Sequence, residues 1–361
     1  MASTIDLCVA DLVHERIRHA DRLTPDLAHR VAASLLPLSR PDSGEVPAID
    51  FEFVDRMPVP SIRAEFGVRL APDGGVWIGD RFARGALVTV RDGKFSVQLD
   101  RSADANLLEL VRTPLLEHAL YDVGGGTLRA ACVEVDGRRV AIGGWSGNGK
   151  TRVVLELLLE HGGRLLGDDL VAVTPLGDVA PLWCGLTLRP DHDLQLAKSP
   201  GRGSRLSRAA ARWLDQYENH PNGRRTPRAV VGVGARGMRH FMERRVGFQE
   251  IAVDHRLGSQ GRIDALLVLG PATGAKDPIR LLAAFGCSYS AHLAAFEAGF
   301  RYQGLQEPLL PDFDRRLQVA KKALAETKVL YGKADDLSQA RAVVGELLDA
   351  VSTDAGRGLR R

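Results

Sequence analysis

The sequence predicts an α/β protein built around a glycine-rich loop, and three observations support this class. A strand-like run leads directly into a glycine-rich loop ending in Lys150 and Thr151, a strongly helical stretch follows, and the next strand-like run ends in two aspartates. Strand, loop, helix and strand in this order form a βαβ unit, which requires some parallel sheet. A segment with helical and β patterns precedes this unit, and a helical segment follows it.

Residues 1–125 are expected to form a helix and a small antiparallel β unit. From Ile5 to Leu36 apolar residues recur three and four positions apart, which is typical of a helix. Between Ile49 and Asp100 the hydrophobic period changes to two, which is typical of strands. A further helix is expected from Asn106 to Leu120. The expected strands are Phe51–Val54, Val76–Ile78, Ala86–Val90 and Phe95–Leu99.

Residues 126–300 are expected to form an α/β core around the glycine-rich loop. A hairpin turned at Asp136-Gly137 runs into the glycine-rich loop, and the helix after that loop stops at Gly162-Gly163. The expected elements are the hairpin strands Leu128–Val135 and Arg138–Ile142, the helix Thr151–Glu160, and the strands Arg164–Leu166, Leu170–Val173 and Ile263–Leu269.

Two further segments differ from this pattern. Residues 201–245 form an insertion in the core with 11 arginines and little continuous apolar pattern. This Arg-rich insertion is expected either to close over an anionic ligand or to be a solvated, irregular loop region. In residues 301–361 helical periodicity dominates, so a C-terminal helical segment is expected.

Composition excludes several classes of protein. The 361 residues are 45% hydrophobic and 26% charged, which argues against a disordered or fibrous chain. Nowhere do 18 apolar residues run without a charge, and Asp6, Asp11 and Glu15 interrupt the region where a signal peptide needs an apolar stretch. The net charge of +3 does not indicate nucleic-acid binding. The four cysteines form no CxxC pair, so a reducing, cytoplasmic location is expected.

The motif that carries chemistry has the P-loop spacing GxxxxGK[ST] and spans residues 144–151. Its glycines allow backbone N–H groups to turn around phosphate oxygens, and the helix that follows directs its positive dipole end to the same place. Lys150 is expected to neutralise β- and γ-phosphate charge and the Thr151 hydroxyl to ligate Mg²⁺. The residues expected to bind ATP are Gly144, Ser146, Gly147, Asn148, Gly149, Lys150 and Thr151.

An acidic pair, Asp168 and Asp169, ends the strand after the P-loop helix, 17 residues beyond Thr151. The carboxyl ends of parallel strands lie on one edge of a sheet, so these carboxylates are expected to reach the phosphate site. One can hold Mg²⁺, and the other can accept a proton from an attacking hydroxyl. The alternative is a structural carboxylate that caps a loop.

The run from Arg138 to Val173 resembles the core of the HPr kinase/phosphorylase and PEP-carboxykinase-like P-loop kinases. That family's pattern is a hairpin, a GxSGxGK[ST] loop, a helix ending in glycine, and a strand closing with Asp-Asp. Ser146 and Gly147 match the inner part of the loop, and the preceding LRAACVEVDG resembles the family's lead-in strand. The resemblance covers residues 128–173, and it implies that residues 126–300 form a P-loop kinase core.

This resemblance implies that Lys150 and Thr151 bind ATP and Mg²⁺, that Asp168 is the catalytic base, and that Asp169 helps to organise the metal. The chain departs from the family at Arg129, where these kinases often have a histidine, and at residue 152, where HPr kinases commonly have a glutamate. The second HPr-kinase signature is not found after Asp169. A divergent kinase branch is therefore expected. The resemblance does not imply that HPr is the substrate, and it does not imply the reverse phosphorylase reaction.

The expected function is an ATP-dependent kinase whose acceptor is a hydroxyl of a small metabolite or of a peptide or protein serine, with Asp168 and Lys150 as catalytic residues. The alternative is an ATPase or a nucleotide-gated regulatory module, in which water replaces the alcohol. The two differ in whether ATP turnover requires an added acceptor. Nucleic acid and membranes are not expected partners, and a homo-oligomer is left open.

Weaker candidates lie outside the P-loop. Asp191-His192-Asp193 supplies either a further Mg²⁺ contact or a polar turn. Arg256 and Arg262 either stabilise charge on the transferred phosphoryl group or are surface residues.

Overall fold

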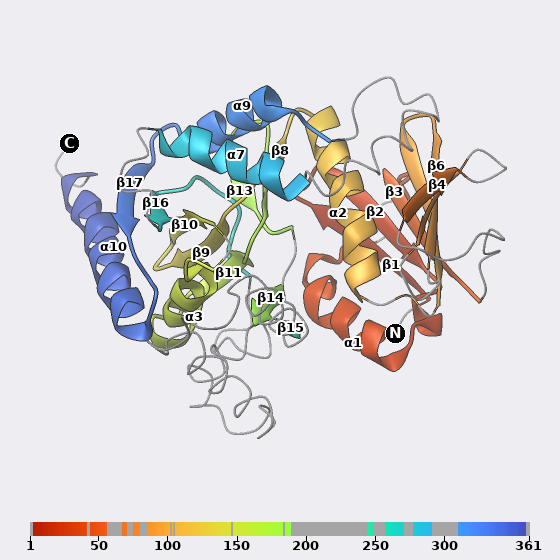
Figure 1. Ribbon diagram of the computed structural model, residues 1–361, viewed down its shortest axis with the longest axis horizontal. Coiled ribbons are helices and arrows are strands. Elements are labelled where there is room, and N and C mark those ends of the chain that lie inside the picture. Colours follow the sequence, from red (N-terminus) through yellow and green to blue (C-terminus); the bar gives the residue numbers. More distant parts are fainter. Residues whose placement is uncertain are drawn as a thin grey trace, which may run out of the picture.

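The structure is a computed structural model that describes residues 3–41, 44–55, 67–70, 75–79, 85–101, 103, 105–145, 147–182, 185–188, 244–247, 257–270, 277–290 and 310–358. Over these residues the chain is an α/β protein with several sheets. An N-terminal sheet lies to one side of helix α2 (Ala105–Asp122) and a core sheet to the other (Figure 1).

The N-terminal sheet has the strand order β1-β2-β3-β7-β6-β5-β4. β2 pairs with β3 and β3 with β7 in parallel, and the other neighbours are antiparallel. The expectation of an antiparallel unit is therefore wrong, because a long crossover through helix α1 (Pro25–Ser34) brings β3 in beside β2 in the same direction. The strands are β1 (Thr4–Val9), β2 (Val13–Arg18), β3 (Ile49–Val54), β4 (Gly67–Leu70), β5 (Val76–Gly79), β6 (Gly85–Arg91) and β7 (Lys94–Asp100).

A hairpin replaces the expected helix over the first part of Ile5–Leu36. β1 and β2 pair antiparallel, and Ala10 and Asp11 turn the chain between them with φ of 56° and 55°. In β2 the apolar Val13 and Ile17 are buried, as is Glu15 between them, while the intervening residues are more exposed. Apolar residues four apart fit one face of a strand as well as one face of a helix, so the spacing does not discriminate between them. Only α1 is helical as expected.

Helices α1 and α2 cover one face of the N-terminal sheet (Figure 1). Thr24 caps α1 by accepting a hydrogen bond from the Leu27 N–H at 3.5 Å, and Pro25 occupies the first helical position. In β3 buried residues alternate with partly exposed ones, because one face packs on the helices and the other faces solvent. The helix expected from Asn106 to Leu120 is confirmed as α2.

A buried ion pair ties α2 to the N-terminal sheet, and the same arginine also reaches the backbone at Leu182. Arg112 of α2 donates from Nη2 to Glu15 Oε2 of β2 at 2.6 Å, and from Nη1 to the carbonyl oxygen of Leu182 at 3.2 Å. The side chains of Arg112 and Glu15 are 1% and 0% exposed. The guanidinium group therefore bridges the N-terminal sheet and the core inside the protein.

The core sheet has the order β11-β9-β10-β16-β17. β10, β16 and β17 are parallel neighbours, while β9 runs antiparallel to both β10 and β11. Parallel sheet is therefore present as expected, although β9 lies between the two strands of the βαβ unit. The strands are β9 (Ala131–Val135), β10 (Arg138–Gly144), β11 (Arg164–Gly167), β16 (Ala265–Leu269) and β17 (Lys328–Gly332).

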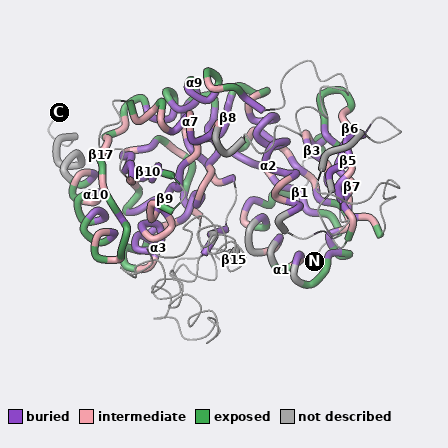
Figure 2. Tube along the Cα trace, in the orientation of Figure 1, coloured by how far each residue is buried: buried purple, intermediate pink, exposed green. Residues whose placement is uncertain are grey.

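Helices cover both faces of the core sheet (Figure 1). Helices α3 (Lys150–Glu160) and α10 (Leu337–Gly358) lie on one face, and α7 (Pro278–Ser290) and α9 (Phe313–Ala323) on the other. Val140 and Ile142 of β10 belong to the apolar cluster under α3 and α10, whereas Ala141 belongs to the cluster under α7 and α9. The buried segments between the layers are visible in Figure 2. This burial on both faces explains why the core strands are almost continuously apolar.

The C-terminal segment is not entirely helical. β17 interrupts it and adds to the core sheet beside β16. The strand is five residues long, lies at the sheet edge, and is only partly buried, so it has no apolar alternation to distinguish it from the helices around it.

Smaller sheets complete the fold. β8 (Gly126–Leu128), β12 (Val171–Val173) and β13 (Val179–Ala180) form a sheet in the order β13-β12-β8, and β14 (Gly185–Leu188) pairs with β15 (Arg244–Gly247). The single strand expected from Leu128 to Val135 is thus two strands, β8 and β9, separated by Arg129 and Ala130.

In the described part of the chain, no helix combines the length and apolar character needed to cross a bilayer.

Candidate functional site

The glycine-rich loop lies at the carboxyl edge of the core sheet. β10, β11, β16 and β17 run in the same direction, so their carboxyl ends share this edge, and the amino end of antiparallel β9 lies there too. The loop after β10 and the acidic pair after β11 therefore meet, as expected from the sequence. Ligands of open α/β sheets bind at such an edge.

The loop conformation depends on its glycines. Gly147 and Gly149 adopt φ of 93° and 84°, in the region that residues with a Cβ rarely occupy. A Cβ on Gly149 would lie 2.2 Å from the carbonyl oxygen of Ala334, which follows β17. Both the backbone angle and the close approach therefore require glycine at this position.

Asn148 anchors the loop to the neighbouring strand. Its Nδ2 donates to the carbonyl oxygen of Leu269, the last residue of β16, at 3.2 Å, and its backbone N–H donates to the Trp145 carbonyl at 3.2 Å. The sequence predicts Asn148 as a nucleotide contact, and in the structure its side chain also anchors the loop to β16.

Lys150, the first residue of α3, directs its ammonium group back into the loop. Its Nζ lies 2.9 Å from the Gly144 carbonyl oxygen and 3.4 Å from that of Trp145, and the residue is 9% exposed. These bonds fix the charge at the loop, where a P-loop lysine meets phosphate.

Thr151 and Asp168 are in direct contact. Thr151 Oγ1 donates to Asp168 Oδ1 at 3.1 Å, and Asp168 is 7% exposed. Asp168 follows the last residue of β11, so the carboxyl end of that strand positions it beside the start of α3.

Asp169 lies between two cationic groups. Its Oδ1 is 3.6 Å from Lys150 Nζ, and its Oδ2 is 3.2 Å from Nη2 of Arg129, which precedes β9. The two adjacent aspartates thus have different partners, as their position at a strand end predicts. In the sequence Arg129 stands out only as a departure from the resembled family, and no local pattern indicates this pairing.

The other arginine departure, Arg152, does not face the phosphate position. Its Nη1 donates to the carbonyl oxygen of Ala334 at 2.8 Å and also contacts that of Asp335, between β17 and α10. Arg152 therefore ties the P-loop helix to the C-terminal segment.

An aromatic side chain borders the loop. Trp145 is 48% exposed, and its ring meets Phe285 of α7 edge to face, with centroids 4.5 Å apart. The loop edge thus has an exposed apolar surface next to the Lys150 partners.

The weaker candidates are not brought into this site. Arg262 precedes β16 at the opposite edge of the core sheet, where its Nε lies 3.3 Å from Asp178 and its Nη1 donates to the Lys322 carbonyl at 3.1 Å. It lies at the surface, at the sheet edge opposite to the glycine-rich loop. Several expected residues lie outside the described ones: Ser146, Asp191-His192-Asp193, Arg256 and nearly all of the Arg-rich insertion.

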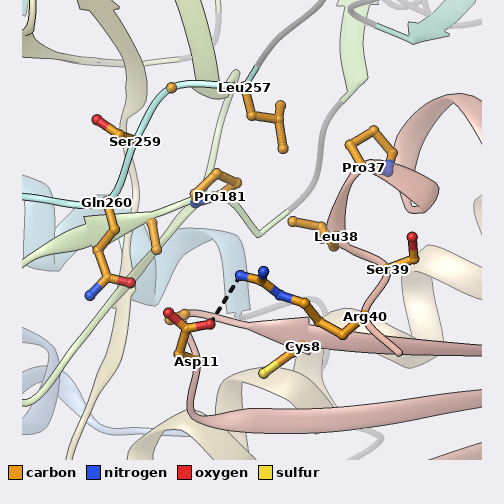
Figure 3. Close-up of a pocket in the computed structure, with 13 residues that line it drawn as sticks. Cys8, Asp11, Pro37, Leu38, Ser39, Arg40, Pro181, Leu257, Ser259 and Gln260 are labelled. Atoms are coloured by element: carbon orange, nitrogen blue, oxygen red, sulfur yellow. Dashed lines mark hydrogen bonds and ion pairs between the residues drawn. The ribbon is translucent and has the colours of Figure 1, made fainter. Parts of the chain in front are cut away.

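A cavity of about 280 Å³ lies away from the P-loop, between the first hairpin and the loop at residues 257–260 (Figure 3). Asp11 and Arg40 on its wall pair with each other at 3.1 Å. Ser259, also on its wall, donates to Glu134 near the carboxyl end of β9, so this cavity is at the opposite edge of the core sheet.

Cysteine chemistry is not supported at the P-loop edge. Cys132 of β9 is fully buried, and this burial raises the pKa of its thiol to about 12. A thiol with so high a pKa is not a nucleophile near neutral pH.

The groups that meet at the glycine-rich loop have the chemistry to bind an anion and a hard cation. Glycine-rich backbone, Lys150 and the start of α3 suit phosphate. The Thr151 hydroxyl and the two carboxylates suit a hard cation. Among the described residues, no cluster of three or more His, Cys, Asp or Glu side chains suits a metal held by protein alone.

Comparisons of the chain with protein-family models and with curated proteins found no match. Function is therefore inferred from the site itself.

Proposed function

We propose that this protein is an ATP-dependent kinase that transfers the γ-phosphoryl group to a hydroxyl acceptor, on a small metabolite or on a peptide or protein serine. The observation that carries the proposal is the 3.1 Å hydrogen bond from Thr151 Oγ1 to Asp168 Oδ1, beside Lys150. It joins the P-loop hydroxyl to a carboxylate from the next strand of the βαβ unit, which is the pairing that holds Mg²⁺ against nucleotide phosphates in P-loop enzymes.

The residues present fit Mg²⁺. This ion prefers oxygen ligands, keeps several waters, and binds proteins through one or two carboxylates together with substrate phosphates. Thr151 and Asp168 offer a hydroxyl and a carboxylate oxygen 3.1 Å apart. When bound there with ATP, Mg²⁺ would offset negative charge on the β- and γ-phosphates.

The contacts favour exchanging the roles that the sequence suggests for the two aspartates. Asp168 bonds the metal-binding hydroxyl of Thr151, which supports a metal role. Asp169 lies 3.6 Å from Lys150 Nζ, which in this proposal holds the transferred phosphoryl group, and its side chain is 49% exposed. An accessible carboxylate there suits proton removal from an incoming acceptor.

In the proposed reaction, one bond to the γ-phosphorus forms as another breaks. The acceptor oxygen forms a new bond to the γ-phosphorus while the bond from that phosphorus to the β,γ-bridging oxygen breaks, and the bridging oxygen leaves on ADP with the bonding electrons. Asp169 takes the acceptor's proton. Lys150 holds the phosphate charge throughout.

The resemblance to the HPr kinase/phosphorylase and PEP-carboxykinase-like kinases supports the same reaction class, since it covers the loop, the helix and the acidic pair in residues 128–173. In the alternative, an ATPase, water takes the place of the alcohol.

The test is to incubate the protein with Mg²⁺, ATP and a panel of metabolites and serine peptides, and to follow ADP release and the mass of each acceptor. A kinase releases ADP only with its acceptor, whose mass rises by one phosphoryl group. ADP release of equal rate without any acceptor supports the ATPase alternative.

A matched pair of lysine variants controls this test. Lys150→Ala should lower turnover about 10²- to 10³-fold, because a preorganised charge at the reacting phosphate is lost. Lys328→Ala should leave turnover unchanged, because Lys328 begins β17 at the opposite sheet edge and donates to the Ala350 carbonyl. Turnover that survives in Lys150→Ala would contradict the proposal.

A further inference from the structure

We propose that Arg129 binds the terminal phosphoryl group of ATP at this site and stabilises its charge during transfer. This inference rests on the proposed function. Arg129 would be a second fixed positive charge at the phosphate, besides Lys150, and it comes from outside the P-loop.

Two strand ladders hold Arg129 at the site. Leu128 of β8 pairs with Val171 of β12, two residues after the acidic pair, and Cys132 of β9 pairs with Gly167 of β11, directly before it. Arg129 lies in the short connection between β8 and β9. The backbone is therefore restrained on both sides of Arg129, and its side chain is 18% exposed.

Asp169 shows where the guanidinium group points. Its two carboxylate oxygens meet Arg129 Nη2 at 3.2 Å and Lys150 Nζ at 3.6 Å. Both cations thus lie around one small anionic group, next to the P-loop. A phosphoryl group is also a small anion with several oxygens, so it fits between the same two cations.

The chemistry of the three groups favours an exchange of partners when ATP binds. The phosphate tail of ATP carries more negative charge than one carboxylate, and Arg donates in a planar fork that matches phosphate oxygens. Arg129 and Lys150 would turn from Asp169 to the γ-phosphoryl oxygens. Asp169 would then be released from its ion pairs to accept the acceptor's proton.

A purely structural ion pair is a poor explanation for this arrangement. The Asp169 side chain is 49% exposed, and ion pairs in contact with water contribute little to the free energy of unfolding. A charge-stabilising arginine in a phosphotransferase, by contrast, accelerates transfer on the order of 10³-fold or more.

The first experiment measures binding of Mg·ADP and of the Mg²⁺ complex of the β,γ-imido ATP analogue by calorimetry. Arg129→Gln should lower the affinity for the ATP analogue about tenfold and leave ADP affinity unchanged, because only the analogue has the γ-phosphoryl group. Arg129→Lys should restore part of the loss. Arg262→Gln is the matched control, since Arg262 is also ion-paired but lies at the opposite sheet edge, and it should change neither affinity.

Equal loss of both affinities in Arg129→Gln would show a structural role and overturn the inference, as would no loss at all. Failure of the wild-type protein to bind either nucleotide would instead overturn the proposed function. The two failures are therefore distinguishable.

The second experiment applies once an acceptor is known. Arg129→Gln should lower kcat on the order of 10³-fold while KM for the acceptor changes little, because the lost interaction is strongest in the transition state. A rise in KM at unchanged kcat would contradict this role.

Discussion

Thr151 Oγ1 lies 3.1 Å from Asp168 Oδ1, although the two residues belong to different elements, the start of α3 and the end of β11. The neighbouring Asp169 instead forms ion pairs with Lys150 and Arg129. One strand end thus supplies two carboxylates with different partners beside the glycine-rich loop.

The two carboxylates should be separable by substitution. Asp168→Asn should shift activity to higher Mg²⁺ concentration, because an amide replaces a charged group beside a hard cation. Asp169→Asn should retain Mg·ATP binding and lose transfer, because an amide cannot take the acceptor's proton. Initial rates across a Mg²⁺ titration, together with calorimetric ATP binding, measure both effects.

Reversed behaviour, with Asp169→Asn requiring excess metal and Asp168→Asn binding normally without transfer, would restore the roles that the sequence suggests. Near-normal transfer in both variants would make the acidic pair structural.

Gly149→Ala should prevent the glycine-rich loop from adopting its conformation. Gly149 has φ of 84°, and a Cβ would lie 2.2 Å from the Ala334 carbonyl oxygen, which is backbone and cannot rotate away. We expect a loss of about 1–3 kcal/mol in the free energy of unfolding, measured with urea, together with loss of ATP binding.

Gly345→Ala is the matched control. Gly345 is exposed in α10, and the methyl group of an alanine there would have nothing within 4 Å, so alanine should stabilise the protein by about 0.5–1 kcal/mol. A Gly149→Ala protein as stable and active as wild type would contradict the loop geometry.

Removal of the buried cation should be costly. Arg112→Met leaves Glu15, which is 0% exposed, without its guanidinium partner, and should lower the free energy of unfolding by about 3–5 kcal/mol. The double change Glu15→Leu and Arg112→Met should recover much of this loss, because no uncompensated charge remains. Urea titrations of the three proteins measure these differences.

Arg18→Met provides the comparison on the surface. Arg18 pairs with Asp50 on the same sheet, but its side chain is 49% exposed, so the loss should stay below about 1 kcal/mol. A cost for Arg112→Met as small as that of Arg18→Met would show that the buried pair carries little stability.

Glu134 should make stability depend on pH. Burial by itself raises the pKa of Glu134, but hydrogen bonds from the hydroxyl and N–H of Ser259, with the charges of Arg139 and Arg164, outweigh it and hold the pKa below 4.5. A lowered folded-state pKa contributes stability above the unfolded-state value, and this stability is lost as pH falls through the folded-state pKa.

Glu134→Gln should therefore lower the free energy of unfolding by about 1–2 kcal/mol at pH 7. The difference in the free energy of unfolding between Glu134→Gln and wild type should narrow as the pH drops below 4.5. Urea titrations at a series of pH values measure it, and a gap that stays constant into the acid range would show that the charge of Glu134 is not responsible.

The sequence by itself determined the central unit of this protein. The strand, glycine-rich loop and helix around Lys150 are encoded by local patterns, namely a short apolar run, glycines and then a helical apolar stripe, and the structure has all three. The position of Asp168 and Asp169 beside this loop also follows from sequence, because a βαβ unit brings the ends of its two strands to one edge.

Only the tertiary structure decided the rest. Val9 and Val13 in the first hairpin have the spacing of a helix, because apolar residues four apart suit both a helix and a strand. Whether this segment becomes a helix or a strand depends on pairing with β3. Lys328–Gly332 forms a strand because its backbone pairs with the free edge of β16. Arg129 came to face Asp169 because two ladders, formed with residues about 40 positions later, hold it there. Such contacts gain their free energy from partners distant in the chain, so no local pattern records them.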